Sequence, residues 1–149
     1  MGELNTGFAY GRNGNCLALM HNAFRALTIA GNAKNKEIQA AAYNMLVIPE
    51  SYVDPARAFE YQHKAIELKG ESKKDVLLML LYNNMASLYL RFNKPDTALM
   101  FATKAEECRV LFHDTYADIW VQKLLGDIYL RMHLPDNALG YYSTVLKLL

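Results

Sequence analysis

The apolar residues of this 149-residue chain fall at the three- and four-residue spacings of helix faces, and no stretch alternates like a half-buried strand. The pattern predicts an all-α fold of about seven helices. Their expected bounds are 14–31, 36–48, 55–69, 73–92, 95–112, 115–132 and 136–148. The second helix is expected to end early or kink at Pro49, because proline lacks a backbone N–H and disfavours helical conformation in the residue before it.

A repeat with a period of 40 residues underlies the last three helical pairs. The segments 54–58, 94–98 and 134–138 align, and each places a proline three residues before an alanine. The prolines are Pro55, Pro95 and Pro135, and the alanines are Ala58, Ala98 and Ala138. Proline suits the first turn of a helix, and alanine allows two helices to cross closely. Each segment is therefore expected to open the second helix of a helical hairpin.

The first helix of each hairpin repeats as well. A small residue, Ala86 or Gly126, is followed three positions later by a tyrosine, Tyr89 or Tyr129. An earlier, partial copy is detectable at a spacing of 39 residues in the segment 25–27. We therefore expect one repeat domain over 1–149, made of a partial repeat at 1–34 and repeats at about 35–72, 73–112 and 113–149. Because the chain begins and ends inside repeats, we expect it to be a piece of a longer protein.

These positions resemble those of the tetratricopeptide repeat (TPR) family. The segment 81–89 is the best single match, and the 40-residue unit resembles the long TPR variety of kinesin light chains and bacterial regulators. The resemblance implies a right-handed α-α superhelix, a TPR-like solenoid whose first helices line a concave groove. Pro49 departs from the family pattern, since it stands where an aromatic residue is expected.

In peptide-binding members of the family, polar residues of the first helices contact the ligand. The resemblance places six residues in this role: Asn44, Asn83, Asn84, Ser87, Lys123 and Asp127. Asparagine suits it, because its amide offers both a donor and an acceptor to an extended backbone. The alternative is that these are solvated polar residues on half-exposed helices. A basic clamp for C-terminal carboxylates is not expected, because Lys123 alone falls at a matching position.

Net charge and the lengths of the apolar runs limit the classes of partner that can be expected. With 16 basic and 15 acidic residues the formal net charge is +1, which gives no electrostatic footprint for direct nucleic-acid binding. The longest apolar run, 76–82, is too short to cross a bilayer, so membrane insertion is not expected. The expected location is the cytoplasm, or the periplasm for a piece of a membrane sensor.

The sequence shows no pattern of catalytic or metal-binding residues. The four histidines, His21, His63, His113 and His133, do not occur at metal-ligand spacings. Cys108 and His113 are five residues apart, and a catalytic pair would need a structured pocket that a solenoid rarely supplies. We therefore expect no enzyme activity, no cofactor and no metal.

Two apolar segments, 76–82 and 145–149, need cover from a neighbour. Burial between repeats is one explanation, and a homodimer formed through exposed apolar helix ends is another. Together the patterns predict a non-catalytic scaffold that binds a peptide segment or a protein partner through its groove. The alternative is a sensory or regulatory TPR module of a larger bacterial signalling or transcription-regulator protein.

Overall fold

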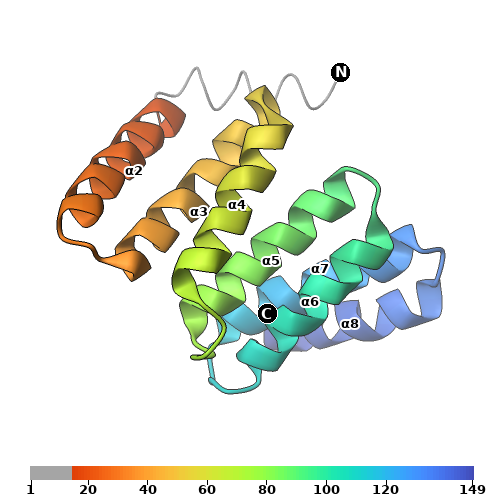
Figure 1. The fold of residues 1–149 in the computed structure, drawn as a ribbon. Coiled ribbons are helices and arrows are strands. Elements are labelled where there is room, and N and C mark those ends of the chain that lie inside the picture. Colours follow the sequence, from red (N-terminus) through yellow and green to blue (C-terminus); the bar gives the residue numbers. More distant parts are fainter. Residues whose placement is uncertain (1–14) are drawn as a thin grey trace. The chain divides into compact units, whose positions relative to one another are not determined.

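The computed structural model describes residues 15–149, and this part of the chain is entirely helical, with no strand (Figure 1). Its seven helices are α2 (Asn15–Asn32), α3 (Lys36–Val53), α4 (Pro55–Lys69), α5 (Val76–Arg91), α6 (Pro95–Arg109), α7 (Thr115–Arg131) and α8 (Pro135–Leu148). The predicted all-α class and helix number are confirmed for the described residues. The first part of the predicted partial repeat, 1–14, lies outside them.

Local capping determines where several of the helices begin. The Asp75 side chain accepts the backbone N–H of Leu78 at 3.0 Å, so α5 begins at Val76 rather than at the predicted residue 73. Asp114 caps α7 in the same way. Proline occupies the first turn of α4, α6 and α8, where its missing N–H costs nothing.

The prediction that the second helix ends near residue 48 was wrong. Helix α3 continues through Pro49 to Val53. An interior proline costs roughly 3 kcal/mol through the lost hydrogen bond and the ring clash. Here Pro49 and its neighbours Leu46, Val47, Glu50 and Ser51 are all buried, and this packing outweighs the local penalty.

The described residues form two compact units, 15–70 and 71–149. In the first unit α3 packs against both α2 and α4 (Figure 1). Its core is built from alanines and a few larger side chains, including Leu46, and Ala58 and Ala65 of α4 are fully buried. Tyr61 of α4 packs against Tyr43 of α3, with ring centroids 5.4 Å apart and planes tilted by 46°. The pair is the counterpart of Tyr82 and Phe101 in the next hairpin, whose centroids are 6.3 Å apart, and Pro49 offers no ring to match Tyr89.

The second unit consists of the hairpins α5–α6 and α7–α8, with α7 also packed against α5 and α6. Each hairpin holds one stacked aromatic pair. Tyr89 and Phe101 have centroids 5.6 Å apart and planes within 7°, and Tyr129 and Tyr141 have centroids 5.4 Å apart and planes within 9°. The 40-residue repeat in sequence therefore corresponds to a repeated contact between the two helices of each hairpin.

Three inter-helix turns share one backbone geometry. Lys34, Asn93 and His133 adopt left-handed φ angles of 53°, 58° and 61°. In each turn the following residue donates its N–H to a carbonyl five residues back, as Lys94 does to Tyr89 at 2.9 Å and Leu134 to Tyr129 at 2.9 Å. None of the three residues is glycine, although asparagine and histidine adopt this conformation more often than most residues.

Small residues lie where the hairpin helices cross. Ala86, Ala98 and Ala138 are 0%, 0% and 2% exposed. A Cβ atom added to Gly126 would lie 2.7 Å from the ring of Tyr142, closer than the two groups can approach. Glycine at this position therefore sets the distance between α7 and α8.

We expect Gly126→Ala to lower the free energy of unfolding by about 1–2 kcal/mol, because the Tyr142 ring must move to admit the methyl group. Urea denaturation followed by circular dichroism measures this change. Gly140→Ala on α8 is the matched control: its Cβ meets nothing within 4 Å, so it should raise stability by about 0.5–1 kcal/mol. Equal effects of the two substitutions would contradict the close crossing at Gly126.

Candidate functional site

A polar cluster fixes α7 against α6. The Arg109 guanidinium donates to both oxygens of Glu106, at 2.6 and 2.7 Å, and also to Asp118 of α7. Gln122 of α7 donates to the Glu106 carboxylate at 3.2 Å. Hydrogen bonds to Glu106 and Asp118 raise the pKa of Arg109 above its ordinary value despite its burial. These charge-assisted bonds set how the second hairpin lies on the first, and hence how α7 lies beside α5.

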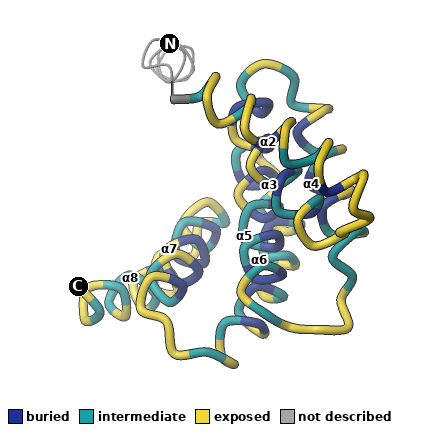
Figure 2. Tube along the Cα trace, turned by 90° about the vertical axis from the view of Figure 1, so that its left-hand side faces the viewer, coloured by how far each residue is buried: buried dark blue, intermediate teal, exposed yellow. Residues whose placement is uncertain are grey.

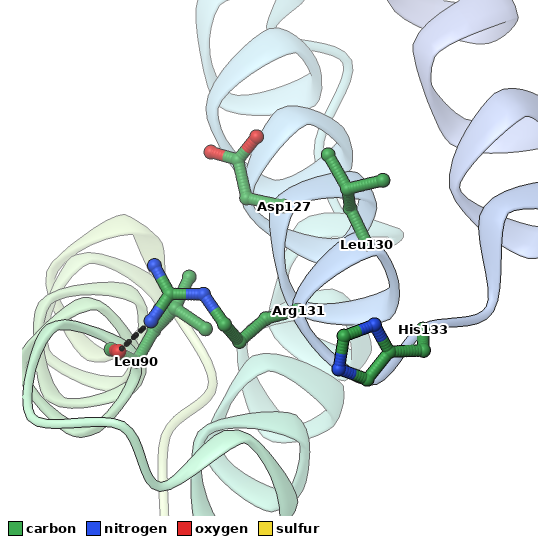
Figure 3. A pocket seen from close by; sticks show the side chains of 5 residues that line it. All are labelled: Leu90, Asp127, Leu130, Arg131 and His133. Atoms are coloured by element: carbon green, nitrogen blue, oxygen red, sulfur yellow. Dashed lines mark hydrogen bonds between the residues drawn. The ribbon is translucent and has the colours of Figure 1, made fainter.

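A cleft of about 460 Å³ opens between the last turns of α5 and α7 (Figure 3). Five residues line it: Leu90 from α5, Asp127, Leu130 and Arg131 from α7, and His133 from the turn that follows α7. The cleft therefore combines two apolar side chains with an acid, a base and a histidine. In Figure 3 the Arg131 side chain reaches from α7 toward the end of α5.

Arg131 is the cation of the cleft. Its Nη1 donates to the Leu90 carbonyl oxygen at 3.5 Å, a long hydrogen bond. A cation is favourable at this place, because the C-terminal end of α5 carries partial negative charge. Within residues 15–149 its guanidinium forms no ion pair with a carboxylate. Arg131 can therefore accept a carboxylate from outside the chain.

Asp127 is held by two partners. Lys123 forms an ion pair with one carboxylate oxygen at 2.7 Å, and the Tyr142 hydroxyl donates to the other at 2.6 Å. Burial, together with this hydrogen bond, raises the pKa of Tyr142 to about 12. Because both oxygens are engaged, Asp127 is oriented by the protein and leaves the charge of Arg131 uncompensated.

The structure brings one of the six predicted groove residues, Asp127, into the lining of the cleft, and Lys123 stands beside it through their ion pair. Asn83, Asn84 and Ser87 lie on α5 outside the lining. Ser87 is exposed and donates to the Asn83 carbonyl at 3.0 Å. Among the described residues, the buried Oδ1 of Asn83 has no hydrogen-bond partner.

Asn84 and the sixth predicted groove residue, Asn44, are half-buried. Asn84 is the helix neighbour of Asn83. Asn44 lies on α3, in the first unit, whereas the cleft belongs to the second. Neither residue belongs to the lining of the cleft.

Sequence reasoning did not name Leu90, Leu130, Arg131 or His133 as site residues. The repeat contained a signal for Leu90, Leu130 and Arg131. The sequence Tyr-Leu-Arg ends both α5 and α7, and Leu90 and Leu130 occupy equivalent positions in it. Within residues 15–149, no group of three or more histidine, cysteine, aspartate or glutamate side chains is placed to hold a metal ion. No helix of that same stretch has both the length and the apolar character needed to span a membrane.

Tyr142→Phe should lower the free energy of unfolding by about 1 kcal/mol at pH 8, because Asp127 loses a hydrogen-bond donor. The folded pKa of Tyr142 is raised from 10.0 to about 12, so the hydroxyl contributes fully below pH 10. Its contribution is lost as the pH rises toward 12, and the difference between the variant and the unaltered chain should vanish there.

Urea titrations at several pH values test this expectation. Tyr116→Phe makes the same chemical change at a side chain that is 73% exposed, and it should leave stability unchanged at every pH. Equal stability of Tyr142→Phe and the unaltered chain at pH 8 would show that the bond to Asp127 contributes nothing.

No protein-family model matches this sequence, and a comparison with curated proteins finds no match either. The internal repeat and the cleft between α5 and α7 are therefore the features from which a function can be inferred.

Proposed function

We propose that this chain is a non-catalytic, TPR-like scaffold domain that binds a peptide segment of a partner protein in the cleft between α5 and α7. The observation that carries the proposal is the cleft itself, where the uncompensated cation of Arg131 lies between two leucines. The repeated hairpin supports the TPR-like, right-handed superhelical part of the proposal. Its buried alanines, stacked aromatic pairs and left-handed turns recur along the chain.

The dimensions of the cleft suit a short stretch of peptide. A volume of about 460 Å³ lies within the range of roughly 300–1,000 Å³ that ligand pockets occupy. Leu90 and Leu130 supply apolar surface for one side chain of the ligand, and Arg131 can bind a carboxylate in a bidentate manner. The preferred ligand therefore carries an acidic residue next to an apolar one.

The fixed orientation of Asp127 sharpens this preference. Lys123 and Tyr142 hold its carboxylate, so Asp127 does not fold back onto Arg131, four residues further along α7. The Asp127 carboxylate thus stands at a fixed position before a ligand arrives, which lowers the ordering cost of binding. The carbonyl of Leu90 loses only a hydrogen bond of 3.5 Å when Arg131 turns to a ligand.

Arg131→Glu tests the proposal with a displayed library of random peptides selected on the unaltered chain. We expect the selected peptides to combine an acidic and an apolar residue, and to bind Arg131→Glu at least roughly tenfold more weakly, a loss of about 1.4 kcal/mol. Fluorescence anisotropy of individual labelled peptides measures the affinities.

Lys73→Glu is the matched control, because it makes the same charge change at a side chain that is 74% exposed near the opposite end of α5. It should leave the affinities unchanged. Failure to select any peptide, or equal loss of binding in both variants, would argue against the cleft. The double variant Asn83→Ala/Asn84→Ala tests the wider groove predicted from the sequence. If peptides bind along that groove, the double variant should bind them more weakly; if they bind in the cleft alone, its affinity should be unchanged.

A further inference from the structure

The exposed residues of α7 lie on one face of the helix. After its first residue, the exposed side chains of α7 are Tyr116, Trp120, Lys123, Leu130 and Arg131. Helical geometry places all of them in a single stripe, together with the half-buried Asp127. In Figure 2 α7 carries both buried and exposed residues along its length, as a helix with one open face does. Asp127, Leu130 and Arg131 also line the cleft, so this α7 face continues the cleft toward the start of the helix.

Two aromatic rings stand at the far end of the α7 face. Tyr116 and Trp120 are 73% and 51% exposed, and they lie about one helical turn apart. Trp120 is the only tryptophan of the chain, and within residues 15–149 its indole N–H donates no hydrogen bond. Tryptophan and tyrosine are enriched among the residues that carry binding energy, because each offers a large rigid ring with a polar group. The two rings therefore form an exposed surface suited to a ligand side chain.

The neighbouring hairpin shows that a following helix leaves this face open. Forty residues earlier, the corresponding residues of α5 include Val76, Leu80 and Ser87. Helix α7 packs on α5, and yet Val76 is 45% exposed, Leu80 is half-buried and Ser87 is exposed. The open face is thus a property of the first helix of each hairpin in this unit and does not depend on α7 being the later of the two.

The charges along the α7 face determine which side chain suits each end. Arg131 at the cleft is uncompensated and attracts a carboxylate. Asp127 is the acidic side chain of the face, and Lys123 and Tyr142 engage both of its oxygens, at 2.7 and 2.6 Å. No unengaged carboxylate of the face therefore draws a cation to the two rings, and an apolar side chain is the favoured occupant there.

The length of the face sets the spacing between these two occupants. Trp120 and Arg131 are eleven residues apart on α7. At a rise of 1.5 Å per residue this corresponds to about 16 Å along the helix axis. An extended peptide rises about 3.3 Å per residue, so about five of its residues cover the same distance.

We propose that the ligand of the cleft extends along α7 and binds it at two places. Its acidic residue pairs with Arg131, and a large apolar residue, preferably aromatic, packs on Trp120 and Tyr116 about five positions away. This two-point binding rests on the proposed peptide-binding function of the cleft and adds the identity and spacing of a second anchor residue. Two linked contacts hold a peptide more tightly than the cleft alone, because the second forms at a high effective concentration.

Peptides selected from the random library on the unaltered chain test the spacing. We expect an aromatic or other large apolar residue to be enriched about five positions from the acidic one. Fluorescence anisotropy should show binding at least roughly tenfold weaker in Trp120→Ala, weaker binding in Tyr116→Ala, and most of the affinity retained in Trp120→Phe. Phe24→Ala, at an aromatic side chain that is 45% exposed on α2, is the matched control and should bind like the unaltered chain.

The intrinsic fluorescence of Trp120 reports the second contact directly, because tryptophan occurs once in the chain. A selected peptide that lacks tryptophan should shift the emission of Trp120 to shorter wavelength, since binding removes water from the indole ring. The same peptide with its aromatic residue changed to glycine should bind at least roughly tenfold more weakly and leave the emission unchanged.

The variants separate the second contact from the cleft. Binding that is lost in Arg131→Glu but unchanged in Trp120→Ala and Tyr116→Ala, with no shift of the Trp120 emission, would overturn the second contact and leave the cleft in place. Binding that requires Trp120 but tolerates Arg131→Glu would contradict the two-point arrangement and the cleft. A library that yields no binding peptide would overturn both.

Discussion

The contact between Arg109 of α6 and Asp118 of α7 is the constraint on which the second unit depends. Each hairpin is closed by its own aromatic pair and small residues, but these contacts do not determine how one hairpin lies on the other. Arg109, Glu106 and Gln122 supply that information through directional, charge-assisted bonds. Together with the direct packing of α7 on α5, this joint positions the two helices that border the cleft.

The sequence predicts those structural features that depend on interactions between residues close together in the chain. The helix starts at Pro95 and Pro135 depend on local chemistry, and so they were predictable to within a residue. Pro49 was misjudged because its local penalty is outweighed by burial, which depends on residues of other helices. Arg131 and Leu90 are 41 residues apart and meet only through the packing of two hairpins, so no local pattern revealed their contact.

The repeated backbone supports surfaces of different character. Forty residues after Glu106 and Arg109 of α6, the chain has Leu146 on α8 and Leu149 directly after it. The first pair makes a specific internal joint, whereas the two leucines are exposed. Because the backbone positions of a repeat are fixed by its small and aromatic residues, the outward-facing positions can change from polar to apolar without altering the hairpin.

The left-handed turns have a consequence for how this unit can diversify. Lys34, Asn93 and His133 occupy the same backbone position, and what the turn requires of them is a positive φ angle rather than a particular side chain. His133 nevertheless reaches the rim of the cleft. A substitution of His133 by another residue that accepts a positive φ, such as asparagine, would thus change the charge and hydrogen-bonding capacity of the rim while the hairpin beneath stays the same.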